Sequence, residues 1–327
     1  MPYSIAQRKT YQVTARTWYA KISMKKYIKP ALSVLIILAT AVAFAWYLHA
    51  HPDYIAKLRH TDWRVVVILI LINSILIMVL AAIYQATVRI AGKSLGRQEN
   101  ILLTIYSSIA NFFGPLQSGP GVRAVYLKKR HQVRLRDYTF ATLIYYAMYA
   151  VISALFALVG TRPWWQTLLA VAGAGGASVA VLHWFNRRGK KKDRPRLQLL
   201  PKLLGTLLLL TAIQISLVAV RYYVELQAVQ ANVSIGQAVS YTGAANFALF
   251  VSITPDGIGI REAFLLFSQQ LHGVDTHYIV AASLLDRASY IVFLGLLFLV
   301  ALSLHAKDKL RVTAKKSRED VPGKDAP

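Results

Sequence analysis

The chain has 327 residues, of which 56% are hydrophobic and 16% charged, so its composition is that of a membrane protein and not of a soluble domain. A net charge of +24 would indicate nucleic acid binding in a soluble chain, but Lys and Arg also collect in cytoplasmic loops of membrane proteins, which is the simpler explanation here. The absence of cysteine excludes disulfides, thiol nucleophiles and thiolate zinc sites.

The chain begins with a basic, polar segment, residues 1–30, which we expect to be cytoplasmic. An apolar stretch follows directly, and no small-x-small cleavage site comes after it. The sequence therefore predicts a retained signal-anchor helix at the start of a single membrane domain, residues 31–305.

Six apolar stretches are long enough to cross a bilayer, for which a helix needs about 20 residues. They are residues 30–49, 64–84, 138–161, 163–185, 203–223 and 278–304. Charges, prolines or aromatic clusters bound each of them. The predicted fold is an all-α polytopic membrane protein with about six transmembrane helices.

Two further apolar stretches, residues 101–127 and 237–271, are interrupted near the middle by glycine and proline. The interruptions lie at 114–121 and 255–259. Since such residues break a helix, each stretch predicts two half-helices that meet at a hinge. A re-entrant hairpin and a complete span are both compatible with this pattern.

The distribution of charge favours re-entrant hairpins. If each hairpin returns to the side that it entered, the basic segments all fall on the side of the N-terminus; these are residues 89–97, 128–136, 187–202 and 307–324. The segments 225–236 and 268–277 contain no Lys or Arg and lie on the other side. We therefore expect an inner-membrane protein with both termini cytoplasmic, a basic cytoplasmic loop at 186–202 and a basic, disordered tail at 306–327.

The two interrupted stretches resemble each other. Residues 106–112 read YSSIANF and residues 241–247 read YTGAANF, and a G-x-G-x-R run follows each, at 119–123 and 257–261. Because the predicted hairpins open to opposite sides, residues 64–161 and 203–304 would form inverted repeats. Transporters with this architecture bind substrate where the repeats meet.

Each G-x-G-x-R run places an arginine in the first turn of a half-helix, Arg123 and Arg261. A helix N-terminus carries partial positive charge, so an anionic partner such as a phosphate headgroup would explain the placement. Glycines at 119, 121, 257 and 259 would let the backbone turn sharply and approach that group; these are Gly119, Gly121, Gly257 and Gly259. Alternatively, each arginine caps carbonyls or pairs with a nearby carboxylate to hold the hinge.

The second hinge is richer in charge, with Asp256 and Glu262 near Arg261, and with Asp286 and Arg287 on the next helix. These residues predict a buried ion network. A carboxylate could carry a coupling proton, but an internal salt bridge that fixes the packing is the favoured interpretation. Adjacent helical residues point in different directions, so Asp286 and Arg287 should face different partners.

Asn111 and Asn246 precede the two hinges in equivalent positions. Buried amides need partners, and these two would bind either a headgroup or the freed backbone groups of the hinge. The tyrosines at 145, 146 and 149 are expected to pack inside one span, and lining a lipid groove is the minority interpretation. We find no nucleotide-binding, hydrolase or zinc-protease motif, and predict no cofactor, no metal and no catalytic residue.

The paired hinge motifs, with N-F before G-P and G-x-G-V-R, N-F before P-D-G-I-G-I-R-E, and L-L-D-R in the last span, resemble the lysylphosphatidylglycerol synthase membrane region, or flippase-like integral membrane proteins. The resemblance implies a role in moving a lipid or lipid-linked headgroup, or in assisting an enzyme that works on one. After the last span we expect no room for the soluble aminoacyl-transferase domain of the synthase.

The leading hypothesis is a translocase for an anionic phospholipid or lipid-linked headgroup. The alternative is a membrane-embedded enzyme or accessory subunit that works with a glycosyltransferase or lipid-modifying enzyme on polyprenyl or phospholipid substrates. The sequence does not specify the oligomeric state of the protein, the direction of transport or the energy source.

Overall fold

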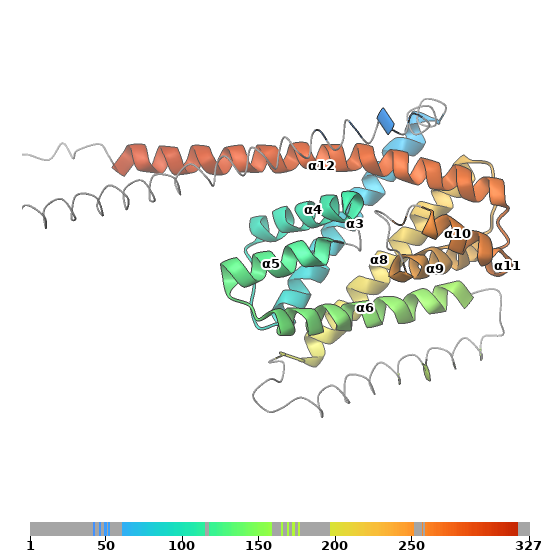
Figure 1. Cartoon of the computed structure of the whole chain (residues 1–327), viewed down its shortest axis with the longest axis horizontal. Coiled ribbons are helices and arrows are strands. Elements are labelled where there is room, and N and C mark those ends of the chain that lie inside the picture. Colours follow the sequence, from blue (N-terminus) through green and yellow to red (C-terminus); the bar gives the residue numbers. More distant parts are fainter. Residues whose placement is uncertain are drawn as a thin grey trace, which may run out of the picture. The chain divides into compact units, whose positions relative to one another are not determined.

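The structure is a computed structural model (Figure 1) that describes residues 61–114, 118–158, 197–251, 257 and 259–319, with a few isolated positions elsewhere. The chain divides into two compact units, residues 1–52 and 53–327, and every element discussed below belongs to the second. Apart from those isolated positions, the predicted spans at 30–49 and 163–185 lie outside the described residues.

Four helices of the described part are long and apolar enough to cross a membrane. They are α3 (Trp63–Ile90), α6 (Leu135–Leu158), α8 (Pro201–Ala228) and α12 (Thr276–Glu319), of which the apolar part is Thr276–Leu304. The other elements within these ranges are helices as well. The all-α polytopic membrane fold is therefore confirmed.

Local sequence explains where these helices begin. The Asp62 carboxylate accepts a 2.9 Å hydrogen bond from the Arg64 N–H and so caps α3. Pro201 occupies the first turn of α8, where its missing N–H costs nothing. At the end of the chain, α12 continues to Glu319, so the expectation of a disordered tail from residue 306 is wrong at least to that point. The continuation contains neither glycine nor proline before Pro322 and is rich in good helix formers.

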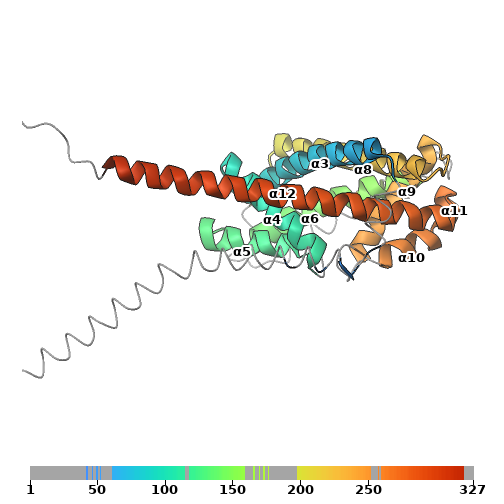
Figure 2. The same ribbon diagram turned by 90° about the horizontal axis from the view of Figure 1, so that it is seen from above.

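The two interrupted stretches form helical hairpins. The first consists of α4 (Arg97–Phe113) and α5 (Gly119–His131), and the second of α9 (Ile235–Val251) and α10 (Ile260–Phe267), which the short α11 (Gln269–His272) follows. Figures 1 and 2 show the first hairpin at one end of this unit and the second at the other. The predicted breaks are thus real; residues 115–117, 252–256 and 258 in the two turns lie outside the described part.

The two halves match in dimension. Helices α3 and α8 each have 28 residues, and α4 and α9 each have 17. Helix α3 packs on α8, and α6 packs on α9. At the second contact the backbones come close, because a side chain at Gly243 would overlap the backbone of Ala157, and Ser240 donates a 2.8 Å hydrogen bond to the Ala157 carbonyl.

Candidate functional site

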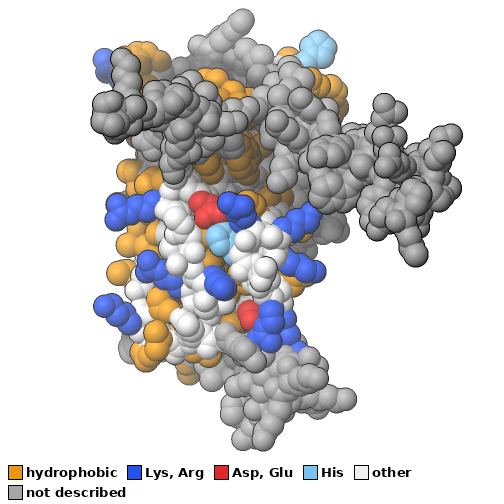
Figure 3. Space-filling view, turned by 90° about the vertical axis from the view of Figure 1, so that its left-hand side faces the viewer, with side chains coloured by type: hydrophobic (Ala, Val, Ile, Leu, Met, Phe, Trp, Pro, Cys, Tyr) orange, Lys and Arg blue, Asp and Glu red, His pale blue; other side chains and the backbone are white. Residues whose placement is uncertain are grey.

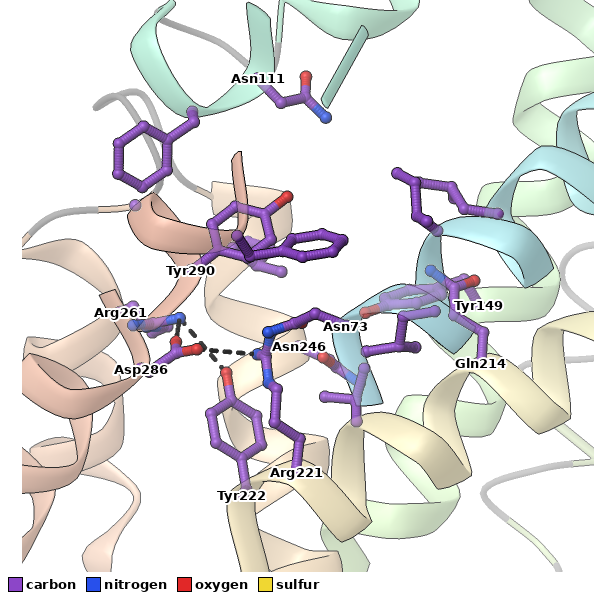
Figure 4. A pocket seen from close by; sticks show the side chains of 18 of the residues that line it. Asn73, Asn111, Tyr149, Gln214, Arg221, Tyr222, Asn246, Arg261, Asp286 and Tyr290 are labelled. Carbon is purple, nitrogen blue, oxygen red and sulfur yellow. Dashed lines mark hydrogen bonds and ion pairs between the residues drawn. The ribbon is translucent and has the colours of Figure 1, made fainter. Parts of the chain in front are cut away.

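A cavity of about 240 Å³ lies among α3, α4, α6, α8, α9, α10 and α12. Its wall is polar as well as aromatic (Figure 4), and the polar lining includes Asn73, Gln214, Arg221, Asn246, Arg261 and Asp286. Asn111 also lines this cavity. Both predicted hinge asparagines, Asn111 and Asn246, and one of the two hinge arginines, Arg261, therefore line the same cavity. The volume suits a headgroup better than a whole lipid, because pockets for drug-sized ligands have about 300–1,000 Å³.

Arg261 and Asp286 form the shortest ion pair of the cavity wall, with 2.7 Å between Arg261 Nη1 and Asp286 Oδ2. Both side chains are at least 95% buried. Arg261 also donates to the hydroxyls of Tyr222 at 3.4 Å and Ser283 at 3.2 Å. The alternative that a hinge arginine pairs with a carboxylate therefore holds for Arg261, although the residue also lines the cavity.

Glu262 and Arg287 form a second ion pair beside the first, with 2.7 Å between Arg287 Nη2 and Glu262 Oε1. The Ser283 hydroxyl donates to the same oxygen, and the Gly259 N–H donates to Glu262 Oε2 at 2.8 Å. Glu262 therefore ties α12 to the first turn of α10. Asp286 and Arg287 face different partners, as predicted, while Asp256 lies outside the described residues.

Arg221 belongs to the site although the sequence analysis did not select it. From α8, its Nη2 atom lies 3.3 Å from Asp286 Oδ1, and its Nη1 atom donates to the Asn73 amide oxygen at 3.3 Å. Asp286 thus lies between two guanidinium groups, as Figure 4 shows. One turn further along α8, Glu225 lies behind Arg221, with 3.6 Å between Arg221 Nε and Glu225 Oε1.

Arg123 is buried, with 4% of its surface exposed, but it does not line the cavity. Its guanidinium carbon lies 3.2 Å from the centroid of the Tyr84 ring, and the ring lines the cavity. In the described ranges, Arg123 has no carboxylate at ion-pair distance, and its Nε atom has no hydrogen-bond partner. The two hinge arginines therefore differ: Arg261 forms an ion pair with Asp286, whereas Arg123 lies on the face of an aromatic ring.

The two hinge asparagines also differ. The Asn111 amide oxygen accepts a 2.6 Å hydrogen bond from the Gly119 N–H, so Asn111 binds the free backbone at the start of α5. The Asn246 side chain is 1% exposed, and its amide nitrogen has no hydrogen-bond partner among the described residues. Asn111 thus makes the predicted hinge contact, whereas Asn246 lines the cavity with an amide nitrogen that has no described partner.

The predicted glycine turns occur only in the second hairpin. Gly257 and Gly259 have φ angles of +70° and +80°, which side chains rarely tolerate. Gly119 and Gly121 are instead part of helix α5, so the expectation of a sharp turn at these two residues is wrong. Gly119 is required for a different reason, since a side-chain carbon there would lie 2.5 Å from the Ser107 carbonyl oxygen.

The tyrosines of α6 do more than pack. Tyr145, Tyr146 and Tyr149 all line the cavity, and the Tyr145 hydroxyl donates to the Gln214 side chain of α8 at 2.9 Å. Tyr145 and Tyr149 are also buried in the hydrophobic core, as the packing interpretation of this stretch expected. The lining of a lipid groove, the minority interpretation, stays a prediction.

A third cluster of polar side chains joins α4 to α5 at the end of the first hairpin that lies opposite its turn. The Glu99 carboxylate on α4 accepts a 2.6 Å hydrogen bond from Tyr126 of α5 and lies 2.8 Å from His131 Nε2. Burial opposes ionisation of Glu99, but these two hydrogen bonds outweigh it and hold its pKa below the ordinary value. Burial and the bond to Glu99 raise the pKa of Tyr126 to about 12, so it donates at neutral pH.

The end of the unit that contains this cluster is basic. The last turn of α5 carries three exposed cations, Lys128, Lys129 and Arg130. Figure 3 faces this end and shows Lys and Arg side chains scattered over it with few acidic ones between them. This is the end that the charge distribution of the sequence assigns to the cytoplasm.

Long apolar helices around a buried charged cavity define a polytopic membrane protein with an internal polar site. The sequence model of the lysylphosphatidylglycerol synthase TM region matches residues 31–298. The chain belongs to that family, which confirms the resemblance inferred from the hinge motifs, and it has a role related to membrane lipids. A comparison with curated proteins found no match.

Proposed function

We propose that this protein translocates an anionic phospholipid or lipid-linked headgroup across the cytoplasmic membrane. The observation that carries the proposal is the group of largely buried arginines at and beside the cavity, Arg221, Arg261 and Arg123. Arg221 and Arg261 share Asp286 in the wall, and Arg123 lies behind Tyr84 with no acidic partner in the described ranges. A charge inside a membrane costs about 2.5–3.5 kcal/mol and usually marks function.

The headgroup would bind in the cavity while its chains stay in lipid. Arg221 and Arg261 would bind its phosphate, and the free amide of Asn246 would donate to one of its oxygens. The cavity has little room for acyl chains, which supports recognition by the headgroup.

We further propose that the two halves, α3–α6 and α8–α12, are inverted repeats that expose this site alternately to the two leaflets. Matching helix lengths and hairpins at opposite ends support this arrangement. So does the spacing of a contact: Tyr84 precedes Arg123 by 39 residues, and Tyr222 precedes Arg261 by 39. The hairpins would be re-entrant, with both chain termini in the cytoplasm.

An enzyme acting on lipid is the weaker proposal. It would need an available acid or base at the cavity, but Asp286 and Glu262 are both engaged by arginine. A glycosyltransferase partner stays a prediction of the sequence, for which the basic end near α5 would be the contact surface.

The proposal is tested with purified protein in liposomes that contain fluorescent phosphatidylglycerol, whose outer-leaflet fraction is quenched by dithionite. Wild-type protein should make nearly all of the probe accessible, and Arg261→Ala and Arg123→Ala should slow this about tenfold or more, since each removes a charge-assisted contact or its support. Lys129→Ala, at the exposed end of α5, is the matched control. Equal rates for all four proteins, or chemical change of the lipid, would contradict the translocase proposal.

The proposed sidedness has a direct test because the chain contains no cysteine. Gln132→Cys after α5 and Thr276→Cys at the start of α12 introduce single thiols at exposed positions. In intact cells, an impermeant thiol reagent should label Thr276→Cys and leave Gln132→Cys unlabelled until the cells are opened. Labelling of both in intact cells would contradict the proposed topology.

A further inference from the structure

Glu225 is a buried carboxyl group to which the proposed transport assigns no role. Its exposed fraction is 0%, and neither carboxyl oxygen has a hydrogen-bond partner in the part of the chain that the structure describes. The contact with Arg221 Nε, at 3.6 Å, is longer than a hydrogen bond. An ionised carboxylate without hydrogen bonds loses several kcal/mol on burial, so this environment favours a protonated Glu225.

The charged neighbours of Glu225 strengthen this conclusion. Asp286 and Glu225 both contact the guanidinium group of Arg221, and two neighbouring carboxylates disfavour simultaneous ionisation. Arg221 opposes this effect, but its guanidinium group is shared among Glu225, Asp286 and Asn73. The titratable and charged groups that face Glu225 from α8, α9, α10 and α12 are Arg221, Tyr222, Tyr241, Arg261 and Asp286.

The state of Glu225 sets the charge next to Arg221, which lines the cavity. Three arginines, Arg221, Arg261 and Arg287, meet three carboxylates, Asp286, Glu262 and Glu225. Among the described residues these charges balance when Glu225 is ionised, and protonation of Glu225 removes one negative charge from beside Arg221. An anion in the cavity would bind Arg221 most strongly when Glu225 does not compete for it.

We propose that Glu225 is a proton-binding site coupled to the cavity, so that an anionic headgroup and a proton bind together. Coupling between binding sites is reciprocal, so the anion raises the affinity for the proton by the factor by which the proton raises the affinity for the anion. A proton gradient could then drive net movement of the anion. This inference rests on the proposed function, since it requires that the cavity bind an anionic headgroup.

The experiment measures the affinity of the detergent-solubilised full chain for dihexanoyl phosphatidylglycerol as a function of pH, with dihexanoyl phosphatidylcholine as the zwitterionic control. The wild-type affinity should fall by about tenfold per pH unit once Glu225 ionises, because one proton is bound with each anion. Glu225→Gln, which mimics the protonated state, should keep the high affinity of acidic pH throughout. Glu225→Asp and Glu99→Gln should retain the pH dependence of the wild type.

Any other outcome overturns either the proton site at Glu225 or the proposed function. A wild-type affinity that does not vary with pH, or an unchanged pH dependence in Glu225→Gln, would overturn the proton site and leave the proposed function standing. Failure of wild-type protein to prefer the anionic lipid would refute the proposed function itself, and with it the inference. If Glu225→Gln does not fold, calorimetry of the wild type in buffers of different ionisation enthalpy still counts the protons taken up, and a count of zero at every pH overturns the proposal.

Discussion

The guanidinium group of Arg123 lies over the ring of Tyr84, with 3.2 Å between its carbon and the ring centroid, and this contact joins the first hairpin to the helix that begins its half of the molecule. Both residues are buried. The face of an aromatic ring stabilises a desolvated cation that has no carboxylate nearby. In the second half Arg261 contacts Tyr222 in the corresponding place, but there Asp286 supplies the negative charge.

The Tyr84 contact predicts a difference between two substitutions. Tyr84→Leu should lower the free energy of unfolding by about 2 kcal/mol, because it removes the ring face from a buried guanidinium. Tyr84→Phe keeps the face and should lose much less. Thermal unfolding in detergent measures both, and an equal loss in the two variants would assign the stabilisation to the hydroxyl group instead.

The hinge asparagines should separate stability from binding. Asn111→Ala removes the acceptor for the Gly119 N–H and should cost about 1 kcal/mol of unfolding free energy. Asn246→Ala should cost less, since its buried amide nitrogen has no partner in the described ranges, but should weaken binding of phosphatidylglycerol about fivefold. Paired unfolding and binding titrations check this, and the reverse ranking would exchange the two assigned roles.

The glycines of the two hairpins should respond differently to alanine. Gly259→Ala forces a side chain into a backbone with φ of +80° and should destabilise the fold by about 1–2 kcal/mol. Gly121→Ala lies inside helix α5, where no described atom would lie within 4 Å of the new carbon, and should stabilise the fold by about 0.5–1 kcal/mol. Denaturation of the two variants beside wild type gives the sign of each change.

The Glu99 cluster should make the first hairpin sensitive to acid. The pKa of Glu99 is lower in the folded state than in the unfolded chain, so its stabilising effect is complete above the unfolded pKa and is lost as the pH falls through the folded pKa. Hydrogen exchange of α4 and α5 should therefore speed up at acidic pH in wild type. In Glu99→Gln the exchange should vary less with pH, and an identical profile would show that another group is responsible.

Much of the fold could be predicted because membrane insertion constrains sequence directly. The apolar spans at 64–84, 138–161, 203–223 and 278–304 correspond to α3, α6, α8 and the apolar part of α12, and the glycine-proline interruptions mark the hairpins. The sequence predicted that Arg287 and Glu262 belong to one buried ion network, but it did not predict that these two residues pair. Which atoms meet depends on how α10 packs on α12, and no local pattern specifies that.

Arg221 and Glu225 were missed for an identifiable reason. The predicted span ended at residue 223, so Glu225 was assigned to an external segment, whereas α8 continues to Ala228. A signal was present, because an arginine within an apolar span, followed four residues later by a glutamate, places both charges on one face of a buried helix. The contact between Arg123 and Tyr84 gave no such signal, since it joins positions 39 residues apart through tertiary packing alone.

The Arg–Tyr contacts have a mechanical consequence. Each joins residues within one half of the molecule, so a displacement of one half against the other would leave both intact. The Asn73–Arg221 and Tyr145–Gln214 hydrogen bonds, in contrast, join α3 and α6 to α8 and cross between the halves. Such a displacement would have to break these two bonds, each of which contributes about 0.5–1.5 kcal/mol, together with the Ser240–Ala157 hydrogen bond and the packing of α3 on α8 and of α6 on α9. Any relative movement of the halves therefore has to slide these helices past each other, while each Arg–Tyr contact stays in place within its half.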